Sequence, residues 1–180
     1  MALASPALAQ GQALQESDHE PLTPLSVSGA STYIDVGIRN YKSKKYLQPS
    51  DGSVAVGAKI VQYSFTGEIE QKWLWFDLGG RFTSFENRNS GLNLGIDGAS
   101  TSDGAAAIQA RGSGDFNQDW LVDWDAYGSN SVFALKNRNS GRCLGISNAS
   151  TANNAQVVQF RCDGSLNQAW EGFPWGGAGA

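Results

Sequence analysis

The sequence predicts an all-β fold built from three repeated units that share one hydrophobic core. Three tripeptides of the form Gln-x-Trp, at residues 71–73, 118–120 and 168–170, lie 47 and 50 residues apart. The chain has 22 glycines and six tryptophans among its 180 residues, a composition typical of short strands joined by tight turns. No segment keeps an apolar period of 3.6 residues, which argues against long helices.

The match between the units extends backwards from each tryptophan without a gap. A glutamine lies 11 residues before each tryptophan, a leucine lies 15 residues before that glutamine, and an asparagine lies seven residues before the leucine. In chain order these residues are Gln62, Gln109 and Gln159, then Leu47, Leu94 and Leu144, then Asn40, Asn87 and Asn137. Residues 85–120 and 135–170 are identical at 18 of 36 positions, so we interpret the units as copies of one another. We place them at about 33–76, 82–122 and 132–171.

Four short strands are expected in each copy, and the third copy displays the pattern best. Its strands are expected at 133–136, 143–146 and 156–161, with a fourth beginning at residue 168. Residues 137–141 have the composition of a turn, and residues 148–154 that of a loop. Each copy is too small to bury a core alone, so the three must pack together.

Both ends of the chain lie outside this domain, which we place at residues 32–175. The N-terminal stretch ALASPALAQ contains the small-x-small pattern Ala7-Leu8-Ala9, and we interpret residues 1–9 as the remnant of a secretory signal peptide. The alternative is an Ala-rich disordered tail. Residues 10–31 are polar and are expected to form a flexible linker, and the Gly and Ala residues of 176–180 a disordered tail.

Several functional classes are disfavoured. The net charge of −4, with no basic block, makes nucleic acid a poor partner, and no run of about 18 apolar residues could span a membrane. The only histidine, His19, lies in the expected linker, so the repeats hold no Ser–His or Cys–His pair. No ligand spacing indicates a metal, and no facing carboxylates indicate a glycosidase. We therefore expect no enzyme activity, no cofactor and a monomer.

Three copies of about 45 residues, each ending in Gln-x-Trp, resemble the ricin B-type lectins, which include the family 13 carbohydrate-binding modules. The resemblance covers roughly Tyr33 to Pro174 and implies a β-trefoil, in which a six-stranded barrel is capped by three hairpins. In that family the Trp packs into the core and the Gln makes buried hydrogen bonds. Buried amides are costly unless their polar groups are paired, which fits this role.

The resemblance also implies a disulfide between Cys143 and Cys162, which lie 19 residues apart in the third copy. The alternative is two buried free thiols. A disulfide implies an oxidising compartment, in line with secretion. At the equivalent positions the first copy has Tyr46 and Phe65, which we expect to make an apolar cross-strand contact.

Ricin-type sugar sites combine an acidic residue after the leucine, an aromatic on the third strand and an asparagine before Gln-x-Trp. Sugars offer paired hydroxyls and a C–H face, which these groups can recognise. Carried over to this sequence, the candidate carbohydrate-binding residues are Phe160, Asn167, Gln168 and Ser147 in the third copy, Tyr63 and Gln71 in the first, and Asn117 and Gln118 in the second.

The sequence departs from the family pattern in every copy. The acidic position is occupied by Gln48, Gly95 and Gly145. Asp97 and Ser147, two residues further on, are expected to lie on the same strand face and could take its place. The first copy has Glu70 in place of the asparagine, and the second has Ala110 in place of the aromatic.

These departures leave two hypotheses. The first is a secreted carbohydrate-binding, lectin-like module with shallow pockets, strongest in the third copy and weakest in the second. The second is a sugar-silent β-trefoil that acts as a protein-interaction or inhibitory scaffold. The candidate residues also have simpler interpretations, since Phe160 and Tyr63 could serve strand packing alone, and Asn117 and Asn167 could be turn residues.

Overall fold

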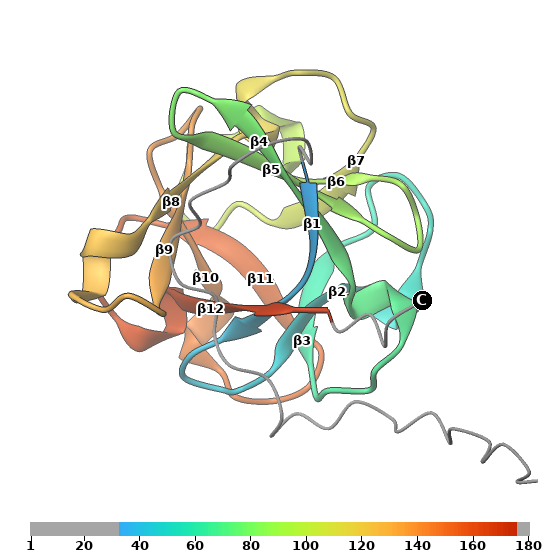
Figure 1. Cartoon of the computed structure of the whole chain (residues 1–180), viewed down its shortest axis with the longest axis horizontal. Helices are drawn as coiled ribbons and strands as arrows, with labels where there is room; N and C mark the ends of the chain where they lie inside the picture. The colour runs from blue at the N-terminus through green and yellow to red at the C-terminus, as the bar shows by residue number, and fades with distance from the viewer. Residues whose placement is uncertain (1–32, 176–180) are drawn as a thin grey trace, which may run out of the picture.

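The computed structural model describes residues 33–175, which form twelve β-strands and several short 3₁₀ turns (Figure 1). In chain order the strands are β1 (Tyr33–Asn40), β2 (Tyr46–Pro49), β3 (Ile60–Tyr63), β4 (Trp73–Gly79), β5 (Phe82–Asn87), β6 (Asn93–Ile96), β7 (Ala107–Ala110), β8 (Trp120–Asp123), β9 (Phe133–Asn137), β10 (Cys143–Ile146), β11 (Ala155–Phe160) and β12 (Ala169–Pro174). The predicted all-β fold with three four-stranded repeats is confirmed. The expected signal remnant, linker and tail lie outside the described residues.

The first and fourth strands of each repeat form a closed barrel. Antiparallel pairing runs from β1 to β4, β5, β8, β9 and β12, and then back to β1. Figure 1 shows the first strand, in blue, meeting the last, in red. Each Gln-x-Trp tryptophan pairs in register with the asparagine that occurs in every repeat, on the first strand of the next repeat, as Trp73 does with Asn87. Closure therefore depends on contacts between repeats.

The second and third strands of each repeat form the hairpins β2–β3, β6–β7 and β10–β11. Each hairpin joins its own barrel strand through one residue pair, such as Arg39 with Tyr46. The hairpins also pair with one another, through Gln62 with Ala155 and through the bridges Lys59–Ile108 and Ala106–Val158. Each of the three hairpins thus contacts the other two, as the threefold repeat requires.

The core is centred on the three tryptophans of the Gln-x-Trp motifs, which are fully buried. The indole Nε1 of each donates to the carbonyl of the leucine 26 residues earlier: Trp73 to Leu47 at 3.0 Å, Trp120 to Leu94 at 3.1 Å, and Trp170 to Leu144 at 2.9 Å. Each indole thus fills the core while its one polar group remains paired.

The cysteines form the expected disulfide between Cys143 and Cys162. At the same place in the first repeat, the rings of Tyr46 and Phe65 lie 5.0 Å apart, which confirms the predicted apolar contact. In the second repeat Asn93 occupies the first position and donates to Gln118 Oε1 at 3.1 Å. The equivalent positions are therefore linked by a disulfide in one repeat and by an aromatic pair in another, while in the second repeat Asn93 binds Gln118 of the following 3₁₀ turn.

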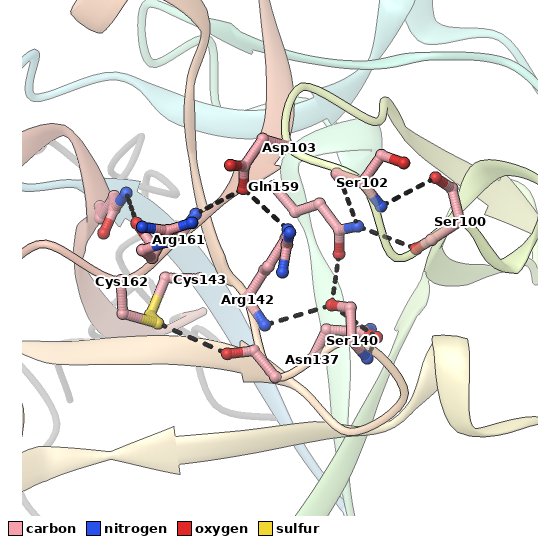
Figure 2. Close-up of polar contacts among 12 residues, drawn as sticks. Ser100, Ser102, Asp103, Asn137, Ser140, Arg142, Cys143, Gln159, Arg161 and Cys162 are labelled. Carbon is pink, nitrogen blue, oxygen red and sulfur yellow. Dashed lines mark hydrogen bonds and ion pairs between the residues drawn. A yellow bond between two sulfur atoms is a disulfide. The ribbon is translucent and has the colours of Figure 1, made fainter.

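The glutamines that lie 11 residues before each Gln-x-Trp tryptophan are buried and connect neighbouring repeats. Gln159 is fully buried, and its Nε2 donates to the carbonyls of Ser100 and Ser102 in the second repeat, at 2.8 and 3.0 Å (Figure 2). Its Oε1 accepts from the Ser140 hydroxyl at 2.7 Å. Gln62 binds the loop of the third repeat, and Gln109 that of the first, in the same way. Each repeat thus holds the loop of the one before it.

Replacing Gln159 by Ala should destabilise the domain by about 3 kcal/mol, because buried carbonyl and hydroxyl groups would lose their partners. The change would be measured by urea unfolding. Thr101→Ala is the control, because Thr101 is exposed in the loop that Gln159 holds, and it should change stability by less than about 0.5 kcal/mol. Equal stability of the two variants would contradict this role.

Candidate functional site

The candidate residues of the third repeat surround the end of the β10–β11 hairpin. Phe160 ends β11 and is 37% exposed, although it lies on the strand that carries the buried Gln159. Asn167 and Gln168 belong to the 3₁₀ turn Leu166–Gln168, which precedes β12. Gln168 Nε2 donates to the carbonyl of Arg161, the residue after Phe160, at 3.0 Å. This bond ties the turn that carries Asn167 to the strand end that carries the aromatic ring.

The glutamines of the Gln-x-Trp motifs are buried and bonded within the protein. Their Nε2 atoms donate to the carbonyls of Ser64, Arg111 and Arg161, which are equivalent positions. The Oε1 atom of Gln71 accepts from the N–H of Thr66, and that of Gln168 from the N–H of Asp163. These contacts give the side chains a positioning role in the loop.

Asn117 and Asn167 are half-buried and occupy equivalent places. Asn117 Nδ2 donates to the Ile96 carbonyl at 2.9 Å, and Asn167 Nδ2 approaches the Ile146 carbonyl at 3.4 Å. The backbone carbonyl of Asn167 accepts from the side chain of Asn40. The longer bond at Asn167 leaves its amide the less firmly held of the two.

The family's acidic position is closed in all three repeats. A Cβ placed on Gly145 would lie 2.9 Å from Gln168 Cγ and 3.2 Å from the Asn167 carbonyl oxygen. At Gly95 the nearest atom, Gln118 Cγ, lies 3.0 Å away. In the first repeat Gln48 is buried, and its Oε1 accepts from Gln71 Nε2 at 2.8 Å. No side chain at these positions is free to meet a sugar.

The expected substitutes for the acid are placed differently from the prediction. β6 ends at Ile96 and β10 at Ile146, so Asp97 and Ser147 begin 3₁₀ turns instead of continuing the strands. The alternation of side chains along a strand therefore does not apply to them, and that part of the prediction is wrong. Ser147 is nevertheless half-exposed at the rim of the third repeat.

Comparison with known proteins decides the family. The family model of the ricin-type β-trefoil lectin domain matches residues 26–110 and 116–178. The chain belongs to this family. Among curated proteins, no sequence matches the chain. The ricin-type fold carries the barrel, the hairpins and the three Gln-x-Trp tryptophans described above.

Solved structures agree with this assignment. The designed threefold-symmetric protein ThreeFoil is 35% identical with a TM-score of 0.73, over 79% of this chain and 99% of that one. The exo-β-1,3-galactanase 1,3Gal43A of Clostridium thermocellum is 28% identical with a TM-score of 0.74, over 78% of this chain and 30% of that one. The Rhizoctonia solani agglutinin shares the fold. It is 18% identical with a TM-score of 0.70, over 84% of this chain and 99% of that one.

Beside the third ricin-type repeat, Tyr127 and Asp163 steady the turn that carries Asn167. Tyr127 donates from its hydroxyl to the Ser165 carbonyl at 3.1 Å. Burial, with the nearby carboxylates of Asp163 and Asp123, raises the pKa of Tyr127 to about 12, so the phenol remains a donor at neutral pH. Hydrogen bonds from Ser165 hold the pKa of Asp163 below its usual value.

Within residues 33–175, no group of three or more His, Cys, Asp or Glu side chains could hold a metal ion. In the same range, no helix has the length and apolar character needed to cross a membrane. The side chains that gather at the ricin-type repeats are aromatic rings, amides and hydroxyls, which recognise ligands through hydrogen bonds and ring contacts.

One residue near Phe160 was not anticipated from the sequence. Asp103 belongs to the second repeat, yet its Oδ1 accepts from the backbone N–H of Arg161 at 2.9 Å. Its place on a neighbouring repeat hides it from any comparison made within one repeat. The contact follows only from the way in which Gln159 holds the loop of the second repeat.

Replacing Gly145 by Ala should destabilise the domain by about 1–3 kcal/mol, because the new methyl group would overlap the packed stem of Gln168. Gly95→Ala is the matched control, since its nearest backbone atom lies 3.5 Å from the new Cβ, against 3.2 Å at Gly145. Thermal unfolding should show the smaller loss for Gly95→Ala. A Gly145→Ala variant as stable as the parent would show that the position is open.

Proposed function

We propose that the chain is a secreted carbohydrate-binding module that recognises glycans through shallow pockets, chiefly in the third repeat and secondarily in the first. The observation that carries this proposal is the exposed ring of Phe160 at a strand end that Gln168 ties to the turn of Asn167. In this account Phe160, Asn167 and Ser147 contact the sugar, and Gln168 positions them. Tyr63 and Gln71 take the corresponding roles in the first repeat.

The chemistry of these groups fits a neutral sugar. A ring can stack on the C–H face of a pyranose, and an amide and a hydroxyl can bind its hydroxyl groups. A single shallow site of this kind gives a dissociation constant near the millimolar level, about −4 kcal/mol. Two sites on one polymeric glycan would raise the apparent affinity through effective concentration.

The second repeat has a structural role in this proposal. Ala110 replaces the aromatic residue, so a sugar at Asn117 and Gln118 would have no ring on which to stack. Asn117 is also the more firmly bonded of the two asparagines, at 2.9 Å to Ile96. We infer that Asn117 and Gln118 hold the loop and contribute little to binding.

Relatives supply the first probes. One similar structure belongs to an exo-β-1,3-galactanase. Another, the ricin B-like lectin of Macrolepiota procera, is 20% identical and was solved in complex with lactose. Galactosides are therefore the first sugars to test. The disulfide supports secretion, since such bonds persist in oxidising compartments, and we propose that the module acts as a monomer without catalysis.

A second function is favoured by one specific observation. The acidic position is filled in every repeat, by close packing at Gly95 and Gly145 and by the internal bond of Gln48. A β-trefoil without sugar sites could serve as a protein-interaction or inhibitory scaffold. This alternative predicts that no glycan binds.

A glycan array with the intact protein and a Phe160→Ala variant separates the two functions. We expect binding by the parent and at least about a tenfold loss for the variant, because aromatic contacts dominate shallow sites. Leu78→Ala is the matched control, since Leu78 is 49% exposed at the end of β4. Absence of binding to any glycan by the parent would support the scaffold function and refute the lectin function.

A further inference from the structure

The loop of each repeat crosses the hairpin of the next at three equivalent junctions. Each loop is fixed at the same point by a backbone bond to the buried glutamine of the neighbour. The three donors are Gly57, Gly104 and Asn154, which bond to the carbonyls of Gln109, Gln159 and Gln62 at 2.8, 2.8 and 2.9 Å. The residue before each donor therefore sits beside the end of the neighbour's third strand.

At the junction of the second and third repeats, that residue is Asp103. Its Oδ1 accepts from the N–H of Arg161 and pairs with Arg142 Nε at 2.7 Å (Figure 2). A Cβ on the next residue, Gly104, would lie 3.7 Å from the tip of the Phe160 ring. The loop of the second repeat thus places the Gly104 backbone next to the ring of Phe160 and a carboxylate on the backbone of the following residue.

The junction of the third and first repeats has a similar arrangement, with a neutral amide in place of the carboxylate. Asn153 Oδ1 accepts from both the N–H and the hydroxyl of Ser64, the residue after Tyr63, at 3.0 Å. Lys45, which is equivalent to Arg142, donates to the Ser64 hydroxyl at 3.0 Å. An aromatic ring, a polar side chain from the neighbouring loop and a cation again occur together.

The junction of the first and second repeats lacks all three groups. Ala110 stands in the place of the ring, Val56 in the place of the loop carboxylate and Leu92 in the place of the cation. Val56 is 53% exposed, so packing does not explain its apolar character. If these polar residues served only to hold the loop, they would be needed equally at all three junctions. The polar loop residue and the cation are instead present only where the aromatic ring is present.

From this correlation we infer that each working sugar site is shared between two repeats, with Asp103 as the acidic group of the Phe160 site and Asn153 as its neutral counterpart beside Tyr63. This inference rests on the proposed carbohydrate binding. Within residues 33–175, Asp103 Oδ1 holds the two internal contacts, and Oδ2 is left as an acceptor for sugar hydroxyls. The Asp103 side chain is 41% exposed, which leaves it accessible to a ligand.

The shared site explains how the family's usual acid could be lost. A side chain at residue 145 is sterically blocked, but Asp103 of the neighbouring repeat binds the N–H of Arg161, the residue after Phe160. A charged acceptor binds hydroxyl groups more strongly than a neutral one. The Phe160 site should therefore be the stronger of the two, since the Tyr63 site has only the amide of Asn153.

The test uses the full chain, labelled with ¹⁵N, titrated separately with lactose, β-1,3-galactobiose, cellobiose and xylobiose. The shared site predicts that the amides of Gly104 and Arg161 shift with at least one disaccharide. The equivalent amides of Gly57 and Arg111 in the apolar junction should not move. This comparison needs no variant and therefore does not depend on how a substitution affects folding.

Asp103→Asn then tests the charge itself. The amide retains an oxygen for the N–H of Arg161, so the joint and the thermal stability should persist, while the affinity for the disaccharide should fall by at least about tenfold. Val56→Ala at the equivalent position of the apolar junction is the control and should leave the affinity unchanged. A fall in affinity with retained stability distinguishes ligand contact from a purely structural role.

The outcomes separate this inference from the proposed function. Disaccharide binding that spares Gly104 and Arg161, or that is unchanged in Asp103→Asn, would overturn the shared site and leave the lectin function intact. A complete lack of shifts with all four disaccharides would overturn the shared site, while the glycan array decides the proposed function separately. Shifts at Gly104 and Arg161 with weakened binding by Asp103→Asn would establish Asp103 as part of the site.

Discussion

The hydrogen bond from each buried indole to a leucine carbonyl in its own repeat is the contact on which the rest of the structure depends. It occurs three times, between 2.9 and 3.1 Å, and it joins the start of a barrel strand to the hairpin above it. A buried aromatic of this size contributes much of the apolar burial of a small domain, and the paired N–H removes the cost of burying it. The barrel and the hairpins thereby keep one relative position in all three repeats.

On that fixed frame the repeats have diverged wherever the frame permits it. One equivalent position carries a disulfide in the third repeat, an aromatic pair in the first and an amide bonded to Gln118 in the second, and the fold is the same in each case. The buried glutamines that connect neighbouring repeats are identical in all three, and each binds two carbonyls of the neighbouring loop and a serine hydroxyl of its own repeat, as Gln159 does. Core positions vary in size as well, as Ile60, Ala107 and Val157 do at one equivalent buried position, while the polar contacts of the glutamines are kept.

Much of the fold could be predicted because its determinants repeat within the chain. The Gln-x-Trp spacing follows from aligning one repeat with another, and the resemblance to ricin-type repeats implied the disulfide between Cys143 and Cys162. Aligning the first repeat with those cysteines then gave the contact between Tyr46 and Phe65. The site was less predictable, because its contacts cross between repeats. The approach of Asp103 to Arg161 depends on the packing of a loop, and the closed space beside Gly145 depends on the path of Gln168.

Hydrogen exchange of the six indole N–H groups, followed by NMR, tests the central role of the tryptophans most directly. The indoles of Trp73, Trp120 and Trp170 should exchange only through global unfolding and should share one free energy of opening. Those of Trp75, Trp124 and Trp175, which are only partly buried, should exchange faster. If any of the first three exchanged as fast as Trp124, the bond from that indole to its leucine carbonyl would not be the contact that holds the fold.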